Sequence, residues 1–174
     1  MIEIKLIDET RKNDINIPNE PFSLSGKMIP IYDGQQWDYT VTKNGTISEM
    51  CFPDENYDYD IMSDNSVFIG AYDGEKCIGL AIMQKAFFKY MYLMDLKVNK
   101  EYRRRGTAKK LIEAAEKVAA GNGYRGIYTT GQDNNIGACL FYIKCGFRIG
   151  GIDTEVYNGT KQEGKTDIVF YLDS

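Results

Sequence analysis

The chain of 174 residues contains no histidine. Histidine is the side chain that changes charge most readily near neutral pH, and it is the commonest metal ligand. Its absence excludes a Ser-His or Cys-His nucleophile, a histidine general base and a histidine-ligated metal. Any proton transfer must therefore use carboxylates, Tyr, Lys, Cys or ordered water.

Closely spaced cysteines and long apolar runs are missing as well. None of the four cysteines forms a C-x-x-C pair, so we expect buried free thiols and no bound metal. No apolar run approaches the roughly 20 residues that cross a bilayer. Residues 1–5 alternate as a strand does and do not resemble a signal peptide. We therefore expect a cytoplasmic protein with no membrane partner.

Charge is distributed unevenly along the chain. Residues 1–64 hold 13 acidic and 5 basic side chains, whereas residues 65–174 hold 12 acidic and 16 basic ones. The basic part suits a phosphorylated cofactor, and the acidic, aromatic first part suits a small cationic substrate. Alternatively, these acids are solvated loop residues that maintain solubility. The overall acidity argues against a nucleic-acid partner.

Hydrophobic periodicity predicts strands and helices in a defined order. Residues 19–64 hold three of the four prolines and are expected to be irregular, with only short helices. A helix is expected from Thr107, ended by 121–123, and another through Lys144, capped by Asp133 or Asn134. Strands are expected at the following ranges: 2–7, 66–72, 76–86, 90–98, 126–130, 147–157 and 166–172. This order predicts an α/β fold, a mixed sheet covered by helices.

A basic, glycine-containing turn lies between the strand at 90–98 and the first long helix. It reads Arg103-Arg104-Arg105-Gly106-Thr107-Ala108. Backbone N–H groups at a helix start have no partner within the helix, and the helix dipole adds positive charge there. On its own such a turn is more often merely solvated. Together with a second motif downstream, it predicts a pyrophosphate site.

The second motif follows about thirty residues later as N-x-x-A-x-x-x-Y-x-x-x-G-F, from Asn135 to Phe147. The pair of motifs, in this order and spacing, resembles the GNAT superfamily of N-acetyltransferases, which use acetyl-CoA. The resemblance implies a mostly antiparallel central sheet of about seven strands flanked by helices. It also implies a single domain over 1–174, with an acceptor-side variable part at 1–64 and an acetyl-CoA-binding core at 66–172.

A closer resemblance lies in three further stretches. They are Pro21-Phe22 with 26–30, Gln132-Asp133-Asn134-Asn135, and 145–150. These stretches are similar to streptothricin acetyltransferases, which acetylate an amino group of the β-lysine side chain of streptothricin. Thr130-Gly131 stands where Glu-Thr is usual, and Met94 stands where an acidic residue is usual. Because both changes remove a carboxylate, a different amine acceptor stays open.

The chemistry of acetyl transfer and the resemblance together imply cofactor-binding residues. Backbone N–H groups of 104–108 would take the pyrophosphate, with charge added by Arg103 or Arg105. The pantetheine arm would pair with the edge of Leu96–Val98, and a main-chain N–H of Leu96 or Val98 would polarise the acetyl carbonyl. Asn135 would bond pantetheine, or else cap its helix.

Two side chains are candidates for the proton transfers. Tyr142 would protonate the leaving thiolate; alternatively, it is a tyrosine that covers the core. Asp95, a carboxylate in an apolar strand, would take the proton of the incoming ammonium. Alternatively, Asp95 is structural and paired with Lys97 or backbone, or water relays the proton to an acidic loop residue.

Three functions remain open at this point. The first is acetylation of a small cationic amine such as the β-lysine moiety of streptothricin. The second is acetylation of a polyamine, a peptide or a protein amine, and the third is acyl-CoA binding without catalysis. Dimers are common in the superfamily, so a homodimer is allowed, although no exposed stripe marks an interface.

Overall fold

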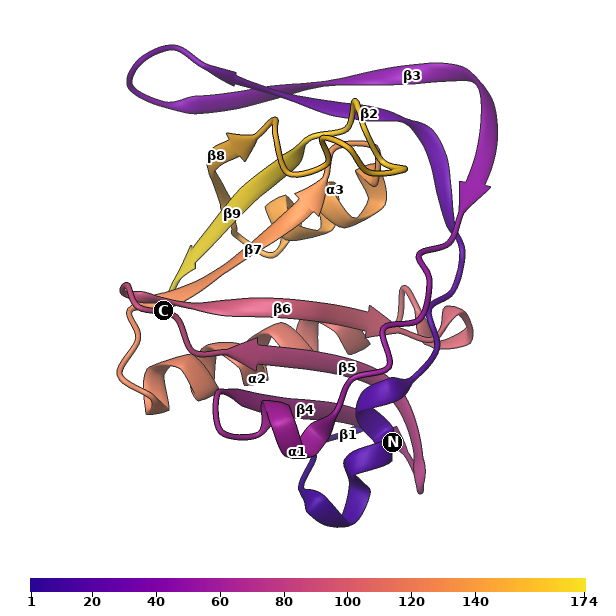
Figure 1. Cartoon of the computed structure of the whole chain (residues 1–174), viewed down its shortest axis with the longest axis vertical. Coiled ribbons are helices and arrows are strands. Elements are labelled where there is room, and N and C mark those ends of the chain that lie inside the picture. The colour runs from indigo at the N-terminus through magenta and orange to yellow at the C-terminus, as the bar shows by residue number, and fades with distance from the viewer. The chain divides into compact units, whose positions relative to one another are not determined.

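The computed structural model describes residues 1–174, which divide into two compact units. The first unit comprises residues 1–20, 52–127 and 174, and the second comprises residues 21–51 and 128–173. Both are drawn in Figure 1. The two units are described separately.

The first unit is built on four antiparallel strands in the order β1-β4-β5-β6. The strands are β1 (Glu3–Leu6), β4 (Ser66–Asp73), β5 (Lys76–Gln84) and β6 (Tyr90–Val98). Its helices are η1 (Glu9–Asn16), α1 (Tyr59–Met62), η2 (Lys100–Tyr102) and α2 (Thr107–Gly121). A Cβ on Gly79 would meet Leu111 of α2, whereas the neighbouring Leu80 packs with Ile15 of η1. Helix α2 therefore covers one face of these strands, and η1 covers the other.

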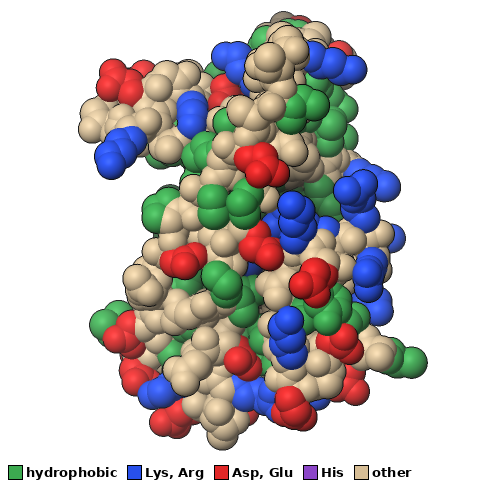
Figure 2. All heavy atoms as spheres, turned by 90° about the vertical axis from the view of Figure 1, so that its right-hand side faces the viewer, with side chains coloured by type: hydrophobic (Ala, Val, Ile, Leu, Met, Phe, Trp, Pro, Cys, Tyr) green, Lys and Arg blue, Asp and Glu red, His purple; other side chains and the backbone are tan.

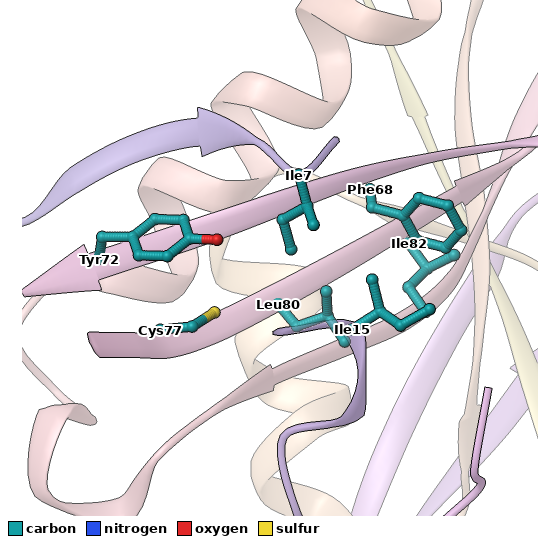
Figure 3. Packing of buried hydrophobic residues seen from close by; sticks show 7 residues of the cluster. All are labelled: Ile7, Ile15, Phe68, Tyr72, Cys77, Leu80 and Ile82. Atoms are coloured by element: carbon teal, nitrogen blue, oxygen red, sulfur yellow. The ribbon is translucent and has the colours of Figure 1, made fainter. Parts of the chain in front are cut away.

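The core beneath η1 holds strand β5 in place. Figure 3 shows seven of its side chains, which point toward one another from η1, β4, β5 and Ile7, the residue after β1. Tyr72, Leu80, Ile82 and Ile15 are fully buried, and each such side chain contributes roughly 1.5–3 kcal/mol by leaving water. The Tyr72 hydroxyl donates a hydrogen bond of 2.7 Å to Oδ2 of Asp14, so its polar end is satisfied. Because β5 pairs with β6, this core fixes the strand that carries the predicted site.

Strand β6 contains a β-bulge. In the ladder with β5, Ile82 lies opposite Asp95 and Met83 lies opposite Leu93, which leaves Met94 without a partner. A bulge re-aims the side chains around it and is frequent beside active sites. The irregularity falls immediately before Asp95 and Leu96, both of which the sequence marked as site residues.

The second unit combines a long hairpin with three further strands and one helix. Its elements are β2 (Phe22–Tyr32), β3 (Trp37–Met50), β7 (Gly126–Gln132, of which 126 and 127 belong to the first unit), α3 (Ile136–Lys144), β8 (Arg148–Asp153) and β9 (Asp167–Asp173). Strands β2 and β3 pair antiparallel and form a two-stranded sheet. The other strands of the unit lie in the order β7-β9-β8, in which β8 and β9 pair antiparallel. Helix α3 packs against β2.

The predicted fold class is confirmed: seven strands of a mixed, mostly antiparallel sheet are flanked by helices. The expectation of an irregular segment over 19–64 was wrong, because β2 and β3 occupy most of it. Pro30 lies within β2 opposite Tyr39. It is tolerated because β2 and β3 form a two-stranded sheet, so that each is an edge strand. Asp33 Oδ1 accepts N–H bonds from Gln35 and Gln36 and so forms the turn.

Other element boundaries also differ from the expectation. Asn135, rather than Asp133 or Asn134, is the N-cap of α3. Strand β8 ends at Asp153, short of the expected 157, because Asp153 Oδ1 accepts N–H bonds from Glu155 and Val156 and turns the chain. None of the helices has the length and apolar character needed to cross a membrane.

Candidate active site

The turn before α2 presents backbone amides to an anion. Gly106, the N-cap of α2, has φ +81°, a conformation that favours glycine. No side chain caps this helix start, and no acidic residue lies in its first turn. Arg104 also has a positive φ, +59°. Apart from its chain neighbours, no heavy atom lies within 4 Å of the position that a Cβ on Gly106 would take, so an anion can approach the start of α2 at this point.

The three arginines of this turn have different surroundings. Arg103 Nε donates to the carbonyl of Val98 at 2.9 Å, and its Nη2 lies 3.6 Å from Oε2 of Glu20. Arg103 therefore ties the turn to β6. The exposed Arg105 lies over the ring of Tyr102, 5.8 Å from its centroid, and Arg104 is exposed as well. The guanidinium groups of Arg104 and Arg105 therefore lie in solvent, beside the backbone amides of the turn.

Asp95 lies in a largely buried polar network on β6. Its Oδ2 accepts a hydrogen bond of 3.1 Å from the Tyr57 hydroxyl and lies 3.0 Å from Nζ of Lys97. Lys97 Nζ also contacts Oε2 of Glu55 and Oδ1 of Asn19, each at 3.0 Å. Burial raises the pKa of Asp95, and Lys97 opposes that rise. Burial also raises the pKa of Tyr57 strongly, so the phenol stays protonated and donates to the carboxylate.

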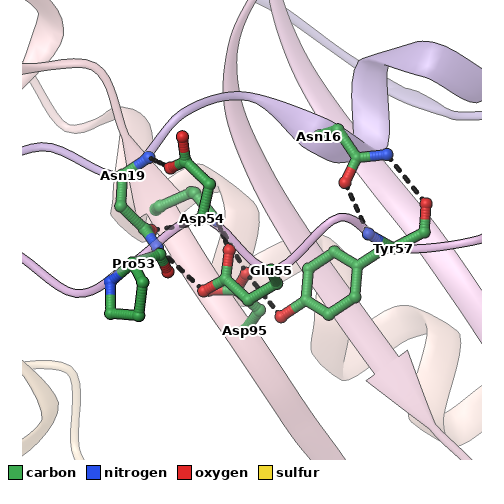
Figure 4. Close-up of polar contacts among 8 residues, drawn as sticks. Asn16, Asn19, Pro53, Asp54, Glu55, Tyr57 and Asp95 are labelled. Carbon is green, nitrogen blue, oxygen red and sulfur yellow. Dashed lines mark hydrogen bonds and ion pairs between the residues drawn. The ribbon is translucent and has the colours of Figure 1, made fainter.

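Two asparagines hold the segment that carries Tyr57, as Figure 4 shows. Asn16 makes two bonds with the backbone of Tyr57: its Nδ2 donates to the carbonyl at 2.8 Å, and its Oδ1 accepts from the N–H at 2.7 Å. Asn19 donates from Nδ2 to the carbonyl of Pro53 and to Oε1 of Glu55, both at 2.9 Å. Residues 16–19 and 53–57 are thus joined beside Asp95.

The acidic residues of the first part of the chain are partly neutralised. Glu55 pairs with Lys97, Asp60 pairs with Lys12, and Glu20 lies beside Arg103. Figure 2 shows one face, on which acidic and basic side chains are interspersed. On that face the excess of acid in residues 1–64 does not form a continuous acidic surface.

Tyr142 and Asn135 lie in the second unit, two turns apart along α3. The Tyr142 ring is buried, 7% exposed, with its centroid 5.3 Å from those of Phe147 and Phe170. Asn135 Oδ1 accepts the N–H of Ala138 at 3.3 Å and so caps the helix. The cap and core contacts that the sequence left open as alternatives are thus present. They do not decide whether either residue also serves the reaction.

The structure brings most of the predicted site residues onto one continuous stretch. Asp95, Leu96, Val98 and residues 103–108 follow each other along β6, the turn and the start of α2, within the first unit. Sequence reasoning assigned no role to Asn16, Asn19 or Tyr57, whose partners are distant in the chain. Tyr57 lies within the acidic, aromatic first part of the chain, whose composition does not single it out.

Comparisons with known proteins agree with these observations. Residues 30–147 match the Acetyltransferase (GNAT) family. The chain is 31% identical over 159 residues to streptothricin acetyltransferase A of Bacillus subtilis (strain 168), covering 91% of this chain and 92% of that one. It is 27% identical over 158 residues to a streptothricin acetyltransferase from Escherichia coli, covering 91% and 79%.

Solved structures resemble the chain over its whole length. A Bacillus anthracis protein described as a streptothricin acetyltransferase, in complex with acetyl coenzyme A, superimposes with a TM-score of 0.88 at 27% identity, covering 100% of both chains. A nourseothricin acetyltransferase superimposes with a TM-score of 0.82 at 18% identity, covering 99% of this chain and 98% of that one. The second likeness concerns the fold alone.

Proposed function

Because the chain belongs to the GNAT family of acetyltransferases, we propose that it transfers the acetyl group of acetyl-CoA to a primary amine of a small cationic molecule, the β-lysine moiety of streptothricin. The observation that carries the proposal is the uncapped start of α2, open to an anion and flanked by arginines. Similarity to streptothricin acetyltransferases over 91% of the chain supports the choice of acceptor. The predicted resemblance to this family is confirmed.

In this proposal the first unit binds the cofactor. Backbone N–H groups of residues 104–108 take the pyrophosphate oxygens, and Arg104 and Arg105 add charge from solvent. Arg103 acts by holding the turn against the Val98 carbonyl. The pantetheine arm pairs with the main chain of Leu96 and Val98, and one of their N–H groups polarises the acetyl carbonyl. Asn135 caps α3 and so fixes the helix that carries Tyr142.

The reaction removes two protons from the acceptor nitrogen and adds one to the CoA sulfur. Asp95 takes the first proton from the incoming ammonium, directly or through water, and the neutral amine attacks the thioester carbonyl carbon. The nitrogen of the tetrahedral intermediate then loses its second proton to water, the carbon–sulfur bond breaks, and Tyr142 protonates the CoA thiolate. Tyr57 and Lys97 both contact Oδ2 of Asp95. We therefore assign Oδ1 as the oxygen that accepts the proton of the ammonium. The buried position of Asp95, which raises its pKa, supports its assignment as the base.

The proposal extends to the organisation and location of the protein. Residues 1–174 act as one N-acetyltransferase domain, with the acceptor on the side of residues 1–64 and acetyl-CoA on residues 66–172. A cytoplasmic location supplies the acetyl-CoA.

A thiol-release assay tests the proposal. Acetyl-CoA is mixed with streptothricin, with a polyamine such as spermidine, or with peptides that carry a free amine, and the CoA thiol is measured. We expect release with streptothricin in preference to the other amines. Release only with peptides or polyamines would identify a different acceptor, and CoA binding without turnover on any amine would indicate a non-catalytic module.

A further inference from the structure

The second unit buries polar atoms at the end of β7 that have no hydrogen-bond partner in the protein. They are Oδ1 of Asp133, both side-chain amide atoms of Gln132 and Oδ1 of the following Asn134. Asp133 and Gln132 are only 6% and 5% exposed. A buried carboxylate oxygen or amide without a partner destabilises the fold, and such groups are therefore uncommon. Their occurrence at consecutive positions of the chain indicates that a bound molecule supplies the missing partners.

The Gln132 side chain shares one face of the strands with two other polar residues. A Cβ on Gly131 would meet Cys139 Sγ and the Phe170 ring, each at 3.2 Å, so that face of β7 is apolar. Side chains alternate along a strand, so Gln132 points to the opposite face. On β9, Asp167 likewise faces away from Phe170, because the two are an odd number of residues apart. Tyr157 donates to Oδ1 of Asp167 at 2.6 Å.

The same polar face brings Gln132 close to Tyr157. The Gln132 amide is close enough to the Tyr157 hydroxyl to lower the pKa of that phenol slightly, against the larger rise caused by burial, but not in hydrogen-bonding geometry. The amide nitrogen and oxygen of Gln132 therefore remain available to a ligand.

Backbone bonds hold Asp133 in position. Its N–H donates to the carbonyl of Thr166 at 2.8 Å, and its carbonyl accepts from the N–H of Met28 at 2.9 Å. The half-exposed Lys27 Nζ lies 4.0 Å from Asp133 Oδ2, beyond hydrogen-bonding distance. The carboxylate is thus fixed between β2 and the start of β9, with a cation near one oxygen and nothing at the other.

The charges of this cluster favour a cationic ligand. Asp133 and Asp167 both belong to it, Asp153 acts on Asp167 through its charge, and Lys27 is the cation near Asp133. N–H donors of the ligand would supply the missing hydrogen bonds to Asp133 Oδ1 and Gln132 Oε1. Gln132 Nε2 needs an oxygen, so the ligand carries a carbonyl or hydroxyl near its charged nitrogen.

We infer that Gln132, Asp133 and Asp167 form a subsite of the second unit that binds the acceptor molecule through a cationic nitrogen next to a carbonyl or hydroxyl oxygen. This inference rests on the proposed function and deepens it, since it names residues that select the acceptor. Lys27 competes with the bound cation for Asp133 in this arrangement.

Two variants with opposite expected effects test the subsite. Binding of streptothricin to the CoA-saturated enzyme is measured by calorimetry. Asp133→Asn, which keeps the shape and removes the charge, is expected to weaken binding by at least about 10-fold, the size of a lost charge-assisted hydrogen bond. Lys27→Gln is expected to tighten binding because it removes the competing cation. The exposed Glu49→Gln and Lys43→Gln in the same unit serve as charge-matched controls and should leave the affinity within twofold.

Kinetics separate a subsite from a structural role. We expect Asp133→Asn to raise the KM for the acceptor and to leave the KM for acetyl-CoA unchanged. Unchanged acceptor affinity in Asp133→Asn, or parallel weakening and a lower melting temperature in both variants, would show that the cluster is structural.

A second readout keeps the inference independent of the proposed acceptor. If the wild-type protein neither binds nor acetylates streptothricin, the proposed acceptor is wrong, and the subsite is then tested with lysinamide and spermidine. Lysinamide carries a carbonyl near its ammonium, whereas spermidine carries no oxygen. Lysinamide should raise the melting temperature more than spermidine, and Asp133→Asn should abolish the difference. Equal shifts for both probes, no shift in the wild-type protein, or a difference that persists in Asp133→Asn would overturn the inference.

Discussion

Lys97 Nζ lies 3.0 Å from Oδ2 of Asp95, and the two side chains come from the same face of β6 because they are two residues apart. Both are largely buried, with 11% and 15% of their side chains exposed. Burial favours the neutral carboxyl group and raises the pKa of Asp95, while the neighbouring ammonium favours the carboxylate. Lys97 therefore sets how far above its usual value the pKa of Asp95 lies.

This pair leads to a pH-dependent prediction. If Asp95 is the general base, it acts only when ionised, so kcat/KM falls as the pH drops through its pKa. Replacing Lys97→Gln removes the charge that lowers this pKa, and the acidic limb of the pH profile should move to higher pH. Asp95→Asn should abolish most activity and the limb with it. A limb at the same pH in Lys97→Gln would assign the titration to another group.

Tyr142→Phe tests the proton donor to the thiolate. Phenylalanine keeps the ring contacts with Phe147 and Phe170 and removes only the hydroxyl. We expect kcat to fall by roughly 10²–10⁴, the usual range for a lost general acid, with little change in the KM for acetyl-CoA. Thermal unfolding of the variant checks that the fold is intact. An unchanged kcat would leave Tyr142 as a core tyrosine only.

The parts of the fold that the sequence predicted depend on local patterns. The apolar stripe of α2 includes Leu111, Ile112, Ala115 and Ala119, which are all buried, as their helical spacing indicated. Gly74 adopts φ +61° in the turn between β4 and β5, where the sequence Asp73-Gly74 is a strong hairpin signal. The β2–β3 hairpin lacked such a pattern, since most of β3 is exposed on both faces and so shows no alternation of apolar and polar residues.

The candidate site divides in the same way. The strand, turn and helix that carry Asp95 and Gly106 are contiguous, so their order could be predicted from spacing. The contacts of Asn19 with Lys97 and of Tyr57 with Asp95 join positions 78 and 38 residues apart. Their pairing depends on how distant segments pack, which composition and periodicity do not encode. The burial of Gln132 at the end of β7 likewise could not be predicted without the fold.

Gly106→Asp tests the anion site at the start of α2. The variant places a negative charge where the pyrophosphate is proposed to bind and strains a backbone with φ +81°. We expect a large loss of CoA affinity in calorimetry. Gly106→Ala introduces similar strain without charge and should weaken binding much less.

Gly123→Asp provides the matched control for position. Gly123 also has φ +81° and open space around its missing Cβ, but it follows the other end of α2. This variant carries the same charge and a similar strain and should bind CoA as the wild-type protein does. Equal affinity of Gly106→Asp and the wild type would contradict a pyrophosphate site at this turn.

Asn16→Ala tests the attachment of the segment that carries Tyr57. The substitution removes both side-chain bonds to the Tyr57 backbone, of 2.8 and 2.7 Å. Each such bond contributes about 0.5–1.5 kcal/mol, so the free energy of unfolding should fall by about 1–3 kcal/mol, measured as a lower urea midpoint. Asn13→Ala, at an exposed position on the same helix, should leave the midpoint unchanged.

Asn16→Ala also has an expected effect on the pH profile. Because Tyr57 donates to Asp95 and so lowers the pKa of that carboxyl, loosening the segment should move the acidic limb of kcat/KM to higher pH. A lower midpoint with an unmoved limb would show that Asn16 stabilises the segment without acting on Asp95.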